Sequence, residues 1–91
     1  MTFEWDEHKN ELNIQKHGLS FEEAQEAFFD KGRIIVSDEK HSEKEKRYFC
    51  LGKCKNGIVT VRFTMRNGKI RIIGAGYWRE GKERYEREHN I

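Results

Sequence analysis

Two arginines four residues apart in one segment, Arg62 and Arg66, are the residues whose spacing points most clearly to chemistry. Residues 58–66 read Ile-Val-Thr-Val-Arg-Phe-Thr-Met-Arg, and successive side chains of a strand point to opposite faces. Asn67-Gly68 follows immediately, and this dipeptide is the strongest short hairpin signal. We therefore expect a basic face on an antiparallel sheet, holding Arg47, Arg62, Arg66, Lys69 and Arg71. Like charges facing each other across strands are destabilising, so this face would gain from a polyanion, although a solvated outer face is the alternative.

The same turn predicts how the strands pair. Three cross-strand pairs are expected on the basic face: Arg66 with Lys69, Thr64 with Arg71, and Arg62 with Ile73. If Asn56-Gly57 forms a second two-residue turn, Arg47 is expected opposite Arg66.

Arginine suits phosphate because its planar guanidinium donates two parallel hydrogen bonds and stays charged. Cleavage of RNA without a metal ion needs a base for the 2′-hydroxyl, stabilisation of the phosphorane and an acid for the leaving 5′-oxygen. The candidate catalytic residues are Arg66, Arg71, Arg79, Glu83 and Tyr85, with Glu83 and Tyr85 as proton carriers. The alternatives are that Glu83 pairs with a basic residue along its helix and that Tyr85 packs in the core.

Other side chains could hold or process the same strand of RNA. His41, in the charged loop 38–45, is a further candidate proton carrier, and an exposed loop residue is the alternative. Tyr77 and Trp78 could stack on unpaired bases or pack the last strand against the last helix. The expected RNA-binding residues are Arg47, Arg62, Lys69, Tyr77, Trp78, Lys82 and Arg84.

The two cysteines, Cys50 and Cys54, indicate buried thiols. Both fall on the core side of one expected strand, where four residues place their Cα atoms about 13 Å apart, too far for a disulfide. No second Cys or His pair stands at ligand spacing, so we expect no metal and no cofactor.

These residues must be positioned by an α+β fold. Asp6 and Gly18 bound an expected helix at 7–17, and a capping box at Ser20 starts a second helix at about 21–29. Strands are expected at 3–5, 34–36, 46–54, 58–66 and 69–77, with a last helix at 82–89. We expect a mostly antiparallel sheet whose apolar face (Val59, Val61, Phe63, Met65, Ile70 and Ile72) is covered by the two N-terminal helices. The last helix should cover Phe49, Leu51 and Ile73 on the other face with Tyr85.

Length and composition set the protein class. A chain of 91 residues with 35% hydrophobic and 37% charged residues fits a single domain, residues 1–91, with a small core. No apolar run approaches the roughly 20 residues of a membrane span, and no cleavable signal is apparent, so we expect a cytoplasmic protein with no membrane partner. Residues 1–30 carry a net charge of −6 and residues 31–91 a net charge of +8, and the basic part favours a polyanionic partner.

A series of short motifs, in order along nearly the whole chain, carries a family resemblance. The motifs are Phe3-Glu4-Trp5-Asp6, Lys9, Lys16-His17-Gly18, Phe21-Glu22-Glu23-Ala24, Phe28, Asp30, His41-Ser42-Glu43, Glu45-Lys46-Arg47, Gly52, Thr64-Met65-Arg66 and Arg71-Ile72-Ile73. The sequence resembles the BrnT family of bacterial toxins, small ribonucleases of the RelE-like fold. The resemblance implies an endoribonuclease toxin of a type II toxin–antitoxin system that inhibits translation. It also implies a BrnA-like antitoxin partner that neutralises the toxin and binds operator DNA.

One departure from the family pattern falls after the last strand. The family usually has Ser-Ala-Arg where this chain has Gly74-Ala75-Gly76, and Arg79 is the candidate replacement for the missing arginine. A catalytically weak or inactive member that binds antitoxin and nucleic acid is therefore the alternative function. A structural subunit that binds a partner protein through the basic face is a third. An acidic, partly disordered antitoxin segment would cover the arginines and compete with RNA.

Overall fold

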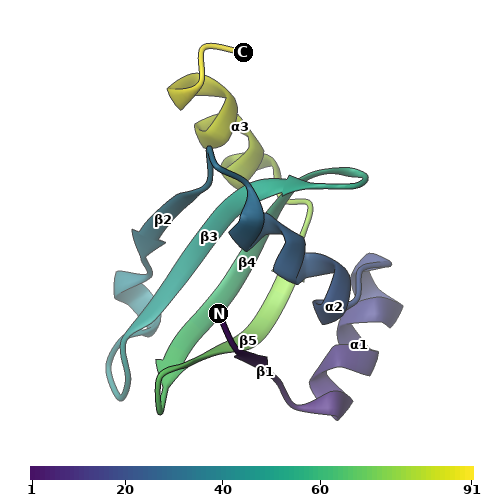
Figure 1. Ribbon diagram of the computed structural model, residues 1–91, viewed down its shortest axis with the longest axis vertical. Helices are drawn as coiled ribbons and strands as arrows, with labels where there is room; N and C mark the ends of the chain where they lie inside the picture. Colours follow the sequence, from purple (N-terminus) through teal and green to yellow (C-terminus); the bar gives the residue numbers. More distant parts are fainter.

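The strands predicted around the two Asn-Gly dipeptides form the centre of a five-stranded sheet. The computed structural model describes residues 1–91, and Figure 1 shows the sheet with its helices. The strands are β1 (Phe3–Glu4), β2 (Ile34–Ser37), β3 (Arg47–Cys54), β4 (Gly57–Arg66) and β5 (Lys69–Gly76). Their order in the sheet is β1-β5-β4-β3-β2. The short β1 runs parallel to β5 and the other neighbours pair antiparallel, so the sheet is mixed but mostly antiparallel, within an α+β fold.

Capping residues fix the N-terminal helices where the sequence predicts them. The Asp6 carboxylate accepts hydrogen bonds from the backbone N–H groups of His8 and Lys9 at the start of α1 (Glu7–His17), and Gly18 ends the helix at φ 64°. Ser20 and Glu23 form the capping box of α2 (Phe21–Ala24). The chain then tightens into the 3₁₀ helix η1 (Gln25–Phe29), where a continuous α-helix was expected.

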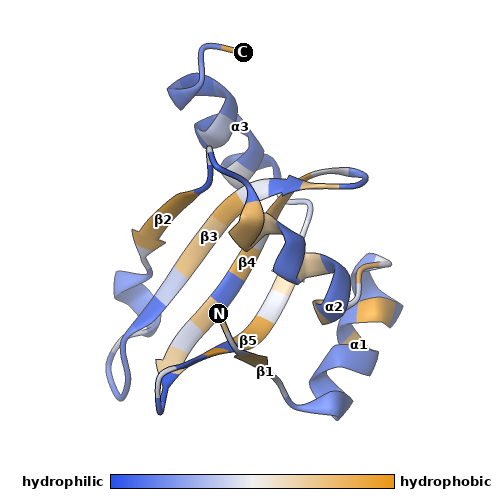
Figure 2. Ribbon diagram, viewed as in Figure 1, coloured by the Kyte–Doolittle hydropathy of each residue, from blue (hydrophilic) through white to orange (hydrophobic).

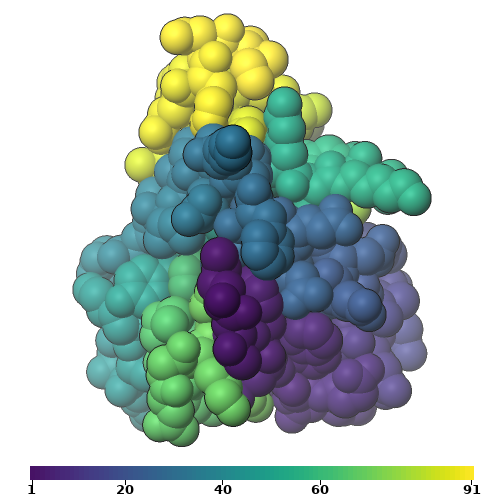
Figure 3. All heavy atoms as spheres, in the orientation of Figure 1, coloured from purple at the N-terminus to yellow at the C-terminus, as the bar shows by residue number.

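The core lies between these helices and one face of the sheet. Twelve residues form it: Leu19, Phe21, Ala24, Ala27, Phe28, Cys50, Val59, Val61, Phe63, Ile70, Ile72 and Ala75. In Figure 3 the N-terminal segment and its helices cover the middle of this face. Met65 was expected in the core, but it is 49% exposed because it lies in the last residues of β4, beyond the cover of the helices.

The last helix packs on the opposite face and covers only one end of it. Helix α3 (Arg79–Glu88) begins three residues earlier than predicted and contacts β3 and β4. A methyl group at Gly81 would collide with the hydroxyl of Thr60, so glycine lets the helix approach β4 closely. Figure 2 shows that α3 is almost wholly hydrophilic, and Tyr85 is its only buried residue. In Figure 1 α3 lies at one end of the sheet and the turn between β4 and β5 at the other.

Two of the predicted cross-strand pairs are wrong. Arg47 pairs with Thr64 instead of Arg66, because Cys54 and Gly57 close the β3–β4 hairpin and shift the register by two residues. Arg62 pairs with Gly74 instead of Ile73, because the register shifts after Arg62–Phe63 and the extra residue leaves Ile73 unpaired. A shift of two residues preserves the faces of a strand, so Arg47 stays on the basic face. The predicted pairs Arg66–Lys69 and Thr64–Arg71 are confirmed.

The cysteines are free thiols, as the spacing predicts. Burial raises the pKa of Cys50 to about 12 and that of Cys54 to about 11, so neither is a thiolate at neutral pH. None of the helices has the length and apolar surface that crossing a lipid bilayer would take.

Candidate nucleic-acid interface

The open part of the basic face is organised in rows that cross the sheet. The first row pairs Arg66 with Lys69, at the turn. The second places Arg47, Thr64, Arg71 and Glu4 on neighbouring strands, and the third places Val36, Phe49, Arg62 and Gly74. A fourth row, Leu51, Thr60 and Gly76, lies at the end that α3 covers. The sheet therefore brings together the five cations Arg47, Arg62, Arg66, Lys69 and Arg71 on one face.

Two acidic residues hold the outer arginines in place. Arg66 Nη2 donates to both oxygens of Glu45, at 3.0 and 3.1 Å, and Arg47 Nη2 lies 3.7 Å from the same carboxylate. The hydrogen bond from Arg66 and the two nearby positive charges keep the pKa of Glu45 below its ordinary value, so this side chain stays an anion. Arg71 Nη1 donates to Glu4 at 3.2 Å. These pairs orient the guanidinium groups but also reduce the positive charge of the face.

Arg62 differs from the other arginines of this face because no acidic side chain pairs with it. It is half-buried between Phe49 and Gly74, and the missing side chain at Gly74 leaves room beside its Cδ atom, which a methyl group there would meet only at 3.9 Å. Arg47 also has a hydrogen-bond donor that the protein does not use, since its buried Nε–H has no acceptor. Arg62 and the exposed Lys69 are thus the cations of this face that no carboxylate occupies.

A histidine–aspartate pair lies in the loop beside the second row. His41 Nδ1 lies 2.8 Å from Asp38 Oδ2, and both belong to the loop that contains the short 3₁₀ helix η2 (Glu39–His41). A carboxylate only accepts hydrogen bonds, so in the neutral imidazole this contact places the proton on Nδ1 and leaves Nε2 as the acceptor. The loop is tied down by Ser42, whose hydroxyl donates to Asp38 O at 2.6 Å and accepts from the Arg47 N–H at 3.0 Å.

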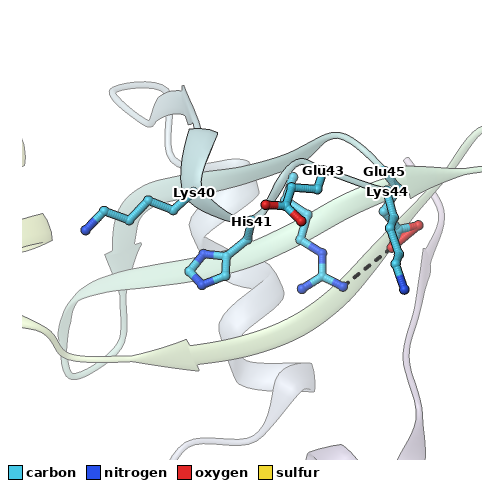
Figure 4. Close-up of a pocket in the computed structure, with 6 residues that line it drawn as sticks. Lys40, His41, Glu43, Lys44 and Glu45 are labelled. Carbon is cyan, nitrogen blue, oxygen red and sulfur yellow. Dashed lines mark ion pairs between the residues drawn. The ribbon is translucent and has the colours of Figure 1, made fainter.

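His41 lines a hollow of about 500 Å³, and every residue that lines this hollow is polar or charged. Its lining residues are Lys40, His41, Glu43, Lys44, Glu45 and Arg47. Figure 4 shows His41 and Lys40 on one side of the hollow, and Lys44 and Glu45 on the other. A proton acceptor, a guanidinium group, two ammonium groups and the carboxylates of Glu43 and Glu45 therefore line one hollow. The first three kinds of group are those that cleavage of a phosphodiester needs.

The structure separates Tyr85 from these groups. Tyr85 is 2% exposed, and its hydroxyl donates to Asp30 Oδ2 at 2.6 Å. Burial, together with this contact to the Asp30 carboxylate, raises the pKa of Tyr85 to about 12. Burial by itself would raise the pKa of Asp30, but hydrogen bonds from Tyr85 and from the N–H groups of Lys53 and Gly32 hold it below its ordinary value. The geometry therefore favours the packing alternative for Tyr85.

Glu83 and Arg79 also lie away from the rows. Gly81 and Tyr85 define the side of α3 that faces the sheet, and residues two positions apart on a helix are rotated by about 200°. Glu83 and Arg79 are both exposed and point away from that side. Lys82 is exposed near Trp78, one turn earlier, and Arg84 lies at the edge of the sheet face with its Nε bonded to Glu88.

The aromatic pair after β5 splits into two environments. Tyr77 is 40% exposed at the end of the sheet, whereas the ring of Trp78 packs edge-on against His17 and over Gly76. A methyl group at Gly76 would lie 2.7 Å from the Trp78 ring. The indole thus occupies the space that any side chain at position 76 would need.

No group of three or more His, Cys, Asp or Glu side chains is arranged to hold a metal ion.

The sequence interpretation missed the importance of Asp38, since a loop of alternating charges contains many acidic residues. The available signal was its spacing of three residues before His41, which lets one turn of helix bring the two side chains together.

One known protein family matches this chain over most of its length. A family model described as ribonuclease toxin, BrnT, of type II toxin-antitoxin system matches residues 5–83. This chain belongs to the BrnT family. Its match covers the helices of the core, the loop of His41 and the rows of the basic face apart from Glu4. BrnT proteins are ribonuclease toxins by this description, and a type II system pairs each toxin with an antitoxin. Among curated proteins, none matches this chain.

Proposed function

We propose that this BrnT protein is a metal-independent endoribonuclease that cleaves single-stranded RNA and thereby inhibits translation. The single observation that carries the proposal is the Asp38–His41 pair, which presents a free imidazole nitrogen beside Arg47 at the edge of the arginine rows. The mostly antiparallel sheet with an open basic face also supports assignment to the RelE-like fold.

The chemistry follows from these positions. His41 Nε2 takes the proton of the 2′-hydroxyl, and the 2′-oxygen attacks the adjacent phosphorus. Arg47 and Arg62 stabilise the additional charge on the phosphorane, while Arg66 and Arg71 hold the neighbouring phosphates. The bond to the 5′-oxygen then breaks and water protonates it, which leaves a 2′,3′-cyclic phosphate and a 5′-hydroxyl. Buried Asp38 keeps the imidazole oriented and stabilises its positive charge after proton transfer.

The proposal moves the proton carrier from the last helix to the loop. Glu83 points to solvent and Tyr85 is bonded to Asp30, so His41 is the residue of this set that can reach an RNA strand on the basic face. Lys69 keeps its expected role in binding. Arg47 and Arg62, expected to bind RNA, take the role in catalysis, and Arg66 and Arg71, expected as catalytic residues, bind the neighbouring phosphates. Arg79, Lys82 and Arg84 contribute positive charge at the border of the site.

The antitoxin that the family implies is proposed to be BrnA-like and to bind operator DNA in the complex. An acidic segment of this partner can cover the rows of cations and exclude RNA by competition. Affinity for the antitoxin should therefore fall steeply with salt concentration, whereas a flat salt profile would indicate an apolar interface.

Incubation of purified protein with single-stranded RNA in EDTA tests the catalytic proposal. We expect cleavage products with 2′,3′-cyclic phosphate ends, and we expect His41→Gln to slow cleavage by about 10²–10⁴-fold. His8→Gln, at an exposed position of α1, is the matched control and should cleave like the wild type. RNA that stays intact at high protein excess, or a His41→Gln protein with the wild-type rate, would contradict the proposal.

A catalytically inactive binding module is the second candidate, and the packing at Gly76 favours it. The family pattern has a basic residue here, and the Trp78 ring leaves no room for one. Expression in cells without an antitoxin separates the two candidates, since an active toxin arrests growth and a binding module does not.

A further inference from the structure

A second hollow lies on the same face, between α3 and the covered end of the sheet. Its volume is about 390 Å³. Strands β2, β3 and β4, helix α3 and the residue before that helix line it, and its lining includes Val36, Phe49, Thr60, Trp78, Glu80 and Arg84. Unlike the hollow beside His41, it combines an apolar, aromatic interior with a few polar groups. This combination is typical of a pocket for a flat organic ring.

The polar groups of the hollow are not used by the protein itself. Glu80 makes no ion pair, and Arg84 uses only its Nε, in the contact with Glu88 at 2.8 Å. Thr60 is 6% exposed, and its hydroxyl has no hydrogen-bond partner in the protein. A ligand would therefore meet a free carboxylate acceptor and a guanidinium with free N–H groups, whereas the Thr60 hydroxyl is buried beneath Gly81 of α3.

The position of this hollow beside Arg47 and Arg62 indicates which class of ligand it would bind. Phe49 lines it, and Arg47 lines the hollow of His41 two residues earlier on the same face of β3, a separation of about 7 Å. Arg62 lies opposite Phe49 on β4, so a cation without an acidic partner stands between the two hollows. An extended RNA strand that places a phosphate at Arg47 and Arg62 would bring the adjacent base to this second hollow.

From these contacts we infer that the second hollow binds one unpaired nucleobase of the RNA substrate, next to the linkage that is cleaved. Phe49 and Trp78 supply apolar and aromatic contact for the base, and Glu80 accepts a hydrogen bond from its exocyclic amino group. The pocket therefore favours cytosine, adenine or guanine over uracil, which has no amino group and whose one remaining donor, N3–H, is flanked by two carbonyl oxygens that repel a carboxylate. This inference rests on the proposed function, because it assigns the substrate specificity of the same face.

Binding of uncleavable RNA tests the inference separately from catalysis. We would measure the Kd of fluorescently labelled 2′-O-methyl hexamers of cytidine, adenosine and uridine by anisotropy. The cytidine and adenosine hexamers should bind about tenfold more tightly than the uridine hexamer. Glu80→Gln should reduce this preference while uridine affinity stays within about twofold. Glu11→Gln, an exposed carboxylate on α1, is the matched control and should keep the wild-type preference.

A spectroscopic measurement reports the position of the base. In a Trp5→Phe protein Trp78 is the only tryptophan, and a base that stacks in the hollow should quench its emission. Equal affinity for all three hexamers, a preference that survives Glu80→Gln, or unchanged Trp78 emission at saturation would each overturn the inference.

The outcomes also distinguish the inference from the proposed function. A protein that cleaves RNA but shows no such preference retains the proposed function and loses the base pocket. A protein that shows the preference but cleaves nothing retains the pocket and loses the endoribonuclease. Failure to bind any hexamer overturns the pocket, and failure to cleave as well overturns both.

Discussion

Asp38 Oδ2 and His41 Nδ1 lie 2.8 Å apart, and the two side chains differ in exposure, at 6% for Asp38 and 50% for His41. A buried acceptor thus fixes one edge of an imidazole whose other edge faces solvent. Ser42 ties the backbone of the same loop to Arg47. The position of the imidazole relative to the arginine rows is therefore set by hydrogen bonds within a short loop.

Asp38→Asn should lower RNA cleavage by about 10²-fold or more, because an amide can stabilise the wrong tautomer of His41 and cannot stabilise its cation. In the His41→Gln background the same substitution should have little further effect, since the two residues act as a unit. Single-turnover rates of the four proteins measure this coupling, and circular dichroism checks that each is folded. Independent, multiplicative effects would show that Asp38 acts on stability alone.

Arg62→Gln should weaken RNA binding and reduce its salt dependence. Each phosphate contact to a single strand contributes about 0.7 to the slope of log K against log salt, so loss of one contact should reduce the slope by roughly that amount. The affinity of an uncleavable RNA at several NaCl concentrations measures the slope. Lys16→Gln, an exposed cation on α1, should leave the slope unchanged. An unchanged slope in Arg62→Gln would remove this residue from the interface.

Tyr85→Phe should destabilise the protein by about 1.5–3 kcal/mol at neutral pH, because it removes a hydrogen bond to a charged acceptor. The pKa of Asp30 is lowered in the folded protein from an ordinary value of 3.8, so its contribution to stability is present above that value and is lost as pH falls through the folded pKa. The difference between wild type and variant should therefore shrink as the pH falls below 3.8 and through the lowered pKa of Asp30. Urea unfolding at several pH values measures it.

The same variant tests the role of Tyr85 in catalysis. Where it remains folded, Tyr85→Phe should cleave RNA at close to the wild-type rate, because the hydroxyl is buried against Asp30. A folded variant that has lost cleavage would return Tyr85 to the set of proton carriers.

Gly52→Ala should destabilise the protein by about 1–3 kcal/mol, since a methyl group there would collide with the backbone of Ala27 in η1. Gly74→Ala is the matched control in the same sheet, because its methyl group would meet only the Cδ of Arg62, at 3.9 Å. Thermal denaturation compares the two. A melting temperature of Gly52→Ala equal to that of the control would contradict this account of the packing between η1 and β3.

Local signals made most of the elements predictable. The caps at Asp6 and Ser20 depend on contacts within three residues, and the turn at Asn67-Gly68 depends on glycine at φ 75° and asparagine at φ 53°. Caps and turns of this kind depend only on neighbouring residues, so they can be recognised in the sequence without knowledge of the rest of the fold. The register shift opposite Arg62 could not be placed in this way. It depends on Ala75 reaching the core beside Val61.

The sequence by itself determined that cations alternate along β4 and β5 and therefore share one face, because side chains of a strand alternate with a period of two. It also determined the family, since the order of short motifs is a property of the chain. Only the tertiary structure decided which of these cations are paired with Glu45 and Glu4, and that Tyr85 is bonded to Asp30. Only the fold decided that α3 meets β3 to form a second hollow. These contacts join residues far apart in the chain, and their geometry depends on how helices and strands pack.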